Sequence, residues 1–195
     1  MSAHDQSEPR EQEDHRVQGD RLEQGNRQPD AHDDARTEGR LTHVREDGSA
    51  HMVDVSAKAV TARVAIASSR LTTRAEVVDQ MLDGTLPKGD ALAVARIAGI
   101  MAAKRTPDLV PLCHPLPLTG VAVDLERAAD DPGAIEVRAR VKTTGVTGVE
   151  MEALTAASVA ALTLYDMVKA LDREAVIGPT RVEHKAGGAS GDWSR

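Results

Sequence analysis

Thr147-Gly-Val-Glu-Met-Glu-Ala-Leu-Thr-Ala-Ala-Ser158, continued to Tyr165-Asp-Met-Val-Lys169, is the stretch from which the fold of this 195-residue chain can be worked out. Its Ala, Leu, Val and Met residues are spread almost all round a helical wheel, which predicts a helix buried against more than one neighbour. Thr147 and Glu150 have the Thr-x-x-Glu spacing of a capping box, so we expect both to satisfy free N–H groups at the helix start.

Polar residues follow one side of this expected helix. At about 100° per residue they share one stripe, which consists of Glu152, Thr155, Thr163, Asp166 and Lys169. The two carboxylates are 14 residues apart, which is roughly 21 Å along a helix axis. One small-molecule site cannot use both ends from a single chain. The stripe is therefore either solvated surface, or each site takes one end of the helix from a different copy.

Strand and helix patterns alternate in the rest of the chain. Strands are expected at 60–71, 118–126, 134–143 and 175–185. Further helices should open at a second capping box, Thr73–Glu76, and at Asp90. From residue 60 the order is β-α-α-β-β-α-β. This is an α+β, ferredoxin-like split βαβ sandwich, in which helices cover one face of an antiparallel sheet and the other face needs a partner.

The first 40 residues differ in composition from the remainder. They hold 6 Arg and 11 Asp plus Glu, and so contribute −5 of the net charge of −7. With few large apolar residues, 1–40 is predicted to be a disordered acidic tail before a globular domain at 41–195. We expect no leader or membrane span. Cys113 is the single cysteine and Tyr165 and Trp193 the only aromatics, which fits a reducing, cytoplasmic location and disfavours proteins that stack on nucleic-acid bases.

Two loops carry residues with potential chemistry. In Leu112-Cys113-His114-Pro115, the imidazole of His114 either transfers protons near neutral pH or only bonds to backbone. Lys88 precedes the helix that Asp90 opens, where backbone N–H groups favour anions such as phosphate, although no Walker A frame is present. The alternative for Lys88 is an exposed loop lysine. Further cations, each of which alone is more often plain surface, are Arg63, Lys104, Arg105 and Lys185.

Asp166 and Lys169 lie three residues apart at the end of the long helix. They form either an exposed ion pair or an acid/base pair in which each group tunes the pKa of the other. In the second case we expect Asp166 to stay ionised as a base, and a crowded lysine beside it to have a lowered pKa and act as an acid.

Several motifs in this order resemble the MoaC family, the cyclic pyranopterin monophosphate synthases of molybdenum cofactor biosynthesis. They include His51-Met-Val-Asp-Val-Ser-Ala-Lys58, Lys88-Gly-Asp90, Pro111-Leu-Cys-His-Pro-Leu116, Thr147-Gly-Val-Glu-Met-Glu-Ala-Leu-Thr155 and Lys185-Ala-Gly-Gly188. The resemblance covers about Leu41 to Asp192 and leaves the N-terminal tail outside.

The resemblance implies a lyase that converts (8S)-3′,8-cyclo-7,8-dihydroguanosine 5′-triphosphate into cyclic pyranopterin monophosphate and releases pyrophosphate. It implies a homohexamer, a trimer of dimers with sites at subunit interfaces. We expect no metal site and no cofactor, and whether a divalent ion accompanies the triphosphate stays open. The implied catalytic residues are Asp166, Lys169 and Lys88. The implied substrate-binding residues are Leu112, Cys113, His114, Glu150, Met151, Glu152, Arg63, Lys104 and Lys185.

Two other classes of protein stay open at this point. A non-catalytic nucleotide sensor would use the same cations and bind nucleotide without consuming it. A purely structural oligomer would bind no nucleotide at all. Neither class explains why Pro-Leu-Cys-His-Pro and Gly-Val-Glu-Met-Glu occur together.

Overall fold

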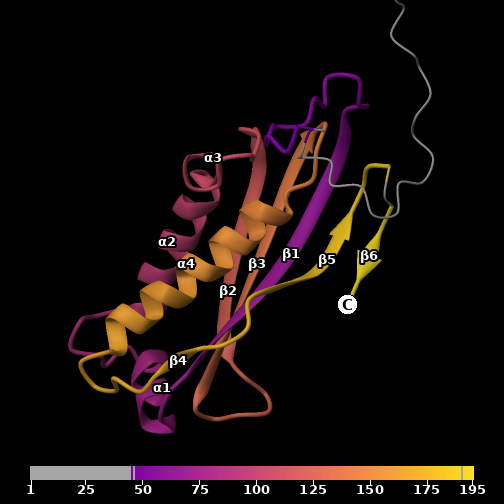
Figure 1. The fold of residues 1–195 in the computed structure, drawn as a ribbon. Helices are drawn as coiled ribbons and strands as arrows, with labels where there is room; N and C mark the ends of the chain where they lie inside the picture. The colour runs from indigo at the N-terminus through magenta and orange to yellow at the C-terminus, as the bar shows by residue number, and fades with distance from the viewer. Residues whose placement is uncertain (1–44, 46, 190) are drawn as a thin grey trace, which may run out of the picture. The chain divides into compact units, whose positions relative to one another are not determined.

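The computed structural model describes residues 45, 47–189 and 191–195 (Figure 1). The predicted tail at 1–40 lies outside the described residues. The helices are α1 (Ala75–Leu82), α2 (Ala91–Ala103), α3 (Thr106–Leu109) and α4 (Glu150–Val168). The strands are β1 (Thr61–Thr72), β2 (Leu118–Arg127), β3 (Ala134–Gly145), β4 (Val176–Ile177), β5 (Arg181–Ala186) and β6 (Trp193–Ser194).

An antiparallel sheet and a layer of helices make up this part of the chain, which confirms the α+β class. The strands are ordered β2-β3-β1-β5-β6, and the short β4 pairs with the end of β1. α2 and α4 lie side by side across one face of the sheet (Figure 1). Strand β3 shows why the sheet has two different faces: Val137, Ala139 and Val141 are fully buried, whereas Arg138 and Arg140 between them are exposed.

Small side chains allow α4 to lie deep in the core. The helix buries alanines on most of its circumference, namely Ala153, Ala156, Ala157, Ala160 and Ala161. Within the described residues, α4 is also the one helix long and apolar enough to cross a membrane by length and composition. However, 50% of that stretch is buried inside the protein, and core helices commonly have this composition.

Both predicted capping boxes are wrong. α4 begins at Glu150 after Val149 and has no side-chain cap, because the Glu150 carboxylate instead pairs with Lys185, with Oε1 and Nζ 3.2 Å apart. α1 likewise has no side-chain cap, because the Thr73 hydroxyl donates to Asp172 Oδ2 at 2.7 Å. Partners distant in sequence have replaced the local ones.

Other boundaries follow the sequence more closely. The prediction that Asp90 opens α2 is confirmed, since its Oδ1 accepts the Ala93 N–H at 2.9 Å. The expected last strand is divided into β4 and β5 by Gly178 and Pro179, and proline cannot donate to a strand ladder. The short α3 and β6 were not expected from the sequence.

Helices α2 and α4 approach each other closely at Gly99. A Cβ atom built on Gly99 would lie 2.9 Å from the Ala156 carbonyl oxygen and 3.2 Å from both Ala160 Cβ and Val123 Cγ2. The first of these contacts is with backbone, which cannot swing aside. The absence of a side chain at Gly99 therefore sets the distance between the two helices.

We expect Gly99→Ala to lower the free energy of unfolding by about 1–3 kcal/mol, because overpacking outweighs the better helix propensity of alanine. Gly120→Ala is a matched control, since a Cβ there would meet nothing nearer than Lys142 at 4.0 Å. Urea unfolding of the two variants measures the difference. A Gly99→Ala protein more stable than the wild type would show that the helices do not meet this closely.

Candidate functional site

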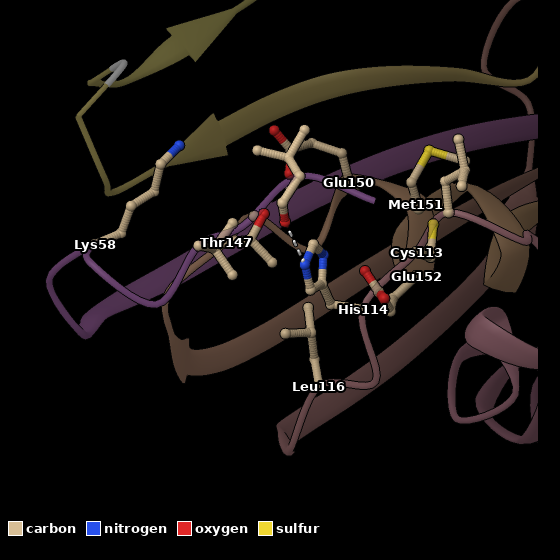
Figure 2. Close-up of a pocket in the computed structure, with 12 residues that line it drawn as sticks. Lys58, Cys113, His114, Leu116, Thr147, Glu150, Met151 and Glu152 are labelled. Atoms are coloured by element: carbon tan, nitrogen blue, oxygen red, sulfur yellow. Dashed lines mark hydrogen bonds between the residues drawn. The ribbon is translucent and has the colours of Figure 1, made fainter. Parts of the chain in front are cut away.

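Three segments enclose a pocket of about 420 Å³ at the start of α4 (Figure 2). They are the extended arm at 51–58, the loop at 112–116 and the turn from β3 into α4. Six predicted substrate-binding residues line this pocket, namely Leu112, Cys113, His114, Glu150, Met151 and Glu152. The structure thus brings together two motifs that are almost 40 residues apart in the sequence.

Glu152 is the most unusual of these residues. Only 3% of it is exposed, and its Oε2 atom is buried without a hydrogen-bond partner among the described residues. Burial, and secondarily the charge of Glu150, raise the pKa of the Glu152 carboxyl group. A buried, unsatisfied carboxylate is costly, so a ligand that offers N–H groups here would remove the penalty. Of the two alternatives for the polar stripe, solvated surface is therefore wrong for Glu152.

Cys113 lies beside Glu152 in the pocket wall (Figure 2). Burial, and secondarily the charge of Glu152, raise the pKa of its thiol above the ordinary value. Since the thiolate is the reactive form, these surroundings disfavour Cys113 as a nucleophile.

His114 connects the loop at 112–116 to the arm. Its Nε2 atom lies 3.0 Å from the Val53 carbonyl oxygen, within hydrogen-bond distance, and its ring lies in the middle of the pocket (Figure 2). The interpretation of His114 as a residue bonded to backbone is therefore confirmed. Its transfer of protons stays a prediction, for a side chain that lines the pocket.

A second cluster lies at the opposite end of α4. Each carboxylate oxygen of Asp166 forms an ion pair with a different lysine. Lys169 Nζ is 2.7 Å from Oδ1, and Lys88 Nζ is 3.1 Å from Oδ2. Lys88 also donates to the Asp166 carbonyl oxygen at 2.6 Å. Hydrogen bonds from Lys169 and then Lys88 lower the pKa of the Asp166 carboxyl group. This direction agrees with the prediction that Asp166 is ionised.

The expected lowered pKa of a lysine in this cluster is wrong for Lys169. Its hydrogen bond to Asp166 raises the pKa of its ammonium group, and the side chain is 52% exposed. Within one chain, water and the single carboxylate outweigh the repulsion between the two ammonium groups.

The remaining predicted cations differ in position. Arg63 donates from Nε to Gly145 O at 3.0 Å and from Nη2 to Val146 O at 3.1 Å, and so holds the loop that leads into α4. Lys185 pairs with Glu150 at the pocket. Lys104 is an exposed residue at the end of α2, outside the pocket lining.

Sequence reasoning missed the part of the pocket wall that belongs to the arm, which consists of Val53, Val55 and Lys58. Polar and apolar residues alternate in His51-Met-Val-Asp-Val-Ser56. This pattern is typical of an extended segment, but it does not show which part of the protein the segment covers. In the part of the chain that the structure describes, no group of three or more His, Cys, Asp or Glu residues could hold a metal ion.

The fold and these two clusters define an α+β protein with a pocket lined by two carboxylates and a separate Asp–Lys cluster at the other end of the same helix. The MoaC family model matches residues 52–188, and the chain belongs to this family. The resemblance of its motifs is thereby confirmed.

Similar proteins named cyclic pyranopterin monophosphate synthase occur in several bacteria. The protein of Corynebacterium efficiens is 63% identical over 154 residues, which cover 79% of this chain and 97% of that protein. That of Streptomyces avermitilis is 65% identical over 156 residues, covering 80% of this chain and 90% of the relative. That of Brevibacillus brevis is 55% identical over 155 residues, covering 80% and 96%.

Glu152→Gln should stabilise the protein at neutral pH, because it removes a buried charge without changing the shape of the side chain. The raised pKa means that the native state binds the proton more tightly than the unfolded state. The free energy of unfolding of the wild type therefore falls as pH rises from the ordinary value of 4.5 through the raised native value.

We expect Glu152→Gln to raise the Tm by about 2–4 °C at pH 7, and the gain to vanish below the unfolded pKa. Thermal scans at pH 4 and pH 7 measure both values. Glu150→Gln is the control, since this half-buried carboxylate has Lys185 as a partner and should give no gain. A pH-independent difference for Glu152→Gln would contradict the buried, unpaired carboxylate.

Proposed function

We propose that this chain is a cyclic pyranopterin monophosphate synthase, a lyase of molybdenum cofactor biosynthesis. Its substrate is (8S)-3′,8-cyclo-7,8-dihydroguanosine 5′-triphosphate, and its products are cyclic pyranopterin monophosphate and pyrophosphate. The observation that carries the proposal is Asp166 held ionised between Lys88 and Lys169 in a chain of the MoaC family.

The two clusters complement the two ends of such a nucleotide. A guanine-derived base presents ring and exocyclic N–H donors, and the buried Glu152 carboxylate with its unpartnered Oε2 would accept them. The triphosphate is a polyanion, and Lys88 and Lys169 would bind it as compact positive charges. The base end therefore belongs in the pocket and the phosphate end at the Asp166 cluster.

The Asp166 cluster also suits the final bond exchange. A ribose-derived hydroxyl attacks the α-phosphate, a new P–O bond forms, and the bond to pyrophosphate breaks. Asp166 accepts the hydroxyl proton as general base, while Lys88 and Lys169 balance the charge that develops on the phosphate oxygens. The earlier ring opening and pyranopterin formation are also proton transfers, which need no redox cofactor.

One chain cannot bring both clusters to one substrate, because they lie at opposite ends of α4, roughly 21 Å apart along its axis. The proposal therefore includes sites at subunit interfaces, with the pocket from one copy and the Asp166 cluster from another, in a cytoplasmic homohexamer built as a trimer of dimers. It includes no resident metal or cofactor; a divalent ion arrives, if at all, with the triphosphate. The order β2-β3-β1-β5, with helices after β1 and β3, supports the ferredoxin-like assignment.

Incubation of the purified protein with the cyclised dihydro-GTP intermediate tests the function directly. We expect cyclic pyranopterin monophosphate and pyrophosphate in equal amounts. Tight binding of the intermediate without product would indicate a nucleotide sensor, and no binding would indicate a structural oligomer.

Asp166→Asn should keep the fold and substrate binding but lower turnover by about 10²- to 10⁴-fold, the usual contribution of a general base. Asp124→Asn is a matched control, because Asp124 is exposed on β2 between the buried Val123 and Leu125 and so faces away from the helices. Initial rates of pyrophosphate release measure the effect. Undiminished turnover in Asp166→Asn would remove Asp166 from the mechanism.

A further inference from the structure

The arm at 51–58 forms one side of the pocket although it belongs to no helix and to no extended strand. His51, Val53 and Val55 are half-buried, whereas Met52, Asp54 and Ser56 between them are exposed. Val53 and Val55 line the pocket. The alternation shows that the arm lies along the pocket with one fixed side turned inward.

Hydrogen bonds determine the course of this arm. The Val53 carbonyl oxygen lies 3.0 Å from His114 Nε2, which fastens the arm to the loop at 112–116. Asp54 Oδ1 accepts the Ser56 N–H at 2.9 Å, and the Lys58 N–H donates to the Val55 carbonyl oxygen at 3.0 Å. These two bonds form a tight turn, and the turn places Lys58 at the rim of the pocket (Figure 2).

Lys58 differs from the lysines described above because no carboxylate of the described residues neutralises its charge. Lys88 and Lys169 both pair with Asp166, and Lys185 pairs with Glu150. Lys58 makes no ion pair with any carboxylate of the described residues, and among the described residues that line the pocket it is the only lysine or arginine. A positive charge held at the rim of a carboxylate-lined pocket suits a ligand that has N–H donors at one end and an anion beyond them.

We propose that Lys58 binds a phosphate group of the substrate, and that the arm at 51–58 is a strap, fastened by His114, that positions this ammonium group. The inference rests on the proposed function and adds a cation that comes from the same copy as the base pocket. Within an interface site, Lys58 would hold the phosphate end from one copy while Lys88 and Lys169 approach it from the other.

Steady-state kinetics of Lys58→Gln test the contact. We expect KM for the cyclised intermediate and the inhibition constant of added pyrophosphate both to rise by about 10- to 100-fold, as for the loss of one charged hydrogen bond. Lys58→Arg keeps the charge and should recover most of the affinity. Lys142→Gln is the control, because Lys142 is an exposed lysine on β3 outside the pocket lining.

A second pair of variants tests the strap. Asp54→Ala removes the acceptor that forms the turn and should raise KM several-fold, although Asp54 itself is exposed and does not line the pocket. Asp54→Asn keeps an oxygen at the same place and should remain near the wild type. In a protein that already carries Lys58→Gln, Asp54→Ala should raise KM little further, because both substitutions act through the Lys58 ammonium group.

Unchanged KM and pyrophosphate inhibition in Lys58→Gln would overturn the proposal, as would an additive effect of Asp54→Ala. Failure of the proposed function has a different signature. In that case the wild type makes no product, and the role of Lys58 is decided by calorimetric binding of pyrophosphate to the wild type and to Lys58→Gln. Equal affinities, or no binding by either protein, would contradict it.

Discussion

The contact between α2 and α4 at Gly99 is the constraint on which the rest of the structure depends. Because Gly99 faces the Ala156 carbonyl oxygen with no room for a Cβ atom, the two helices pack as closely as their backbones allow. Because many buried residues of α4 are alanines, the helix packs closely against both the sheet and α2. This packing fixes the position of α4, and with it the separation of Glu152 and Asp166 near its two ends.

The two ends of α4 place carboxylates in opposite surroundings. Glu152 is buried beside a second carboxylate, which raises its pKa, whereas Asp166 lies in water between two lysines, which lower its pKa. When their surroundings shift the pKa values of two carboxylates in opposite directions, the two groups commonly have different roles in a site. Under the proposed function, the Glu152 end recognises the base and the Asp166 end transfers protons near the phosphate.

Patterns within one element were predictable from the sequence, and contacts between elements were not. Strand alternation gave the α+β class, helix geometry gave the distance from Glu152 to Asp166, and Asp90 was placed correctly as a cap. Both capping boxes failed because Glu150 and Thr73 found partners on distant segments. Glu152 shares its pocket with the arm and the loop at 112–116, and no periodicity in α4 reveals those neighbours. For the same reason, the position of Lys58 at the pocket could not be predicted from the residues next to it in the sequence.

The central claim is that each site combines the pocket of one copy with the Asp166 cluster of another. Subunit mixing tests it most directly, with Asp166→Asn chains and His114→Ala chains refolded together in equal amounts. We expect each variant alone to be nearly inactive and the mixture to regain about a quarter of wild-type turnover, because random pairing gives that share of sites two intact halves. If both clusters served one substrate within a single chain, every site would carry one defect. A mixture no more active than its parents, with mixed oligomers verified by mass, would contradict the interface site.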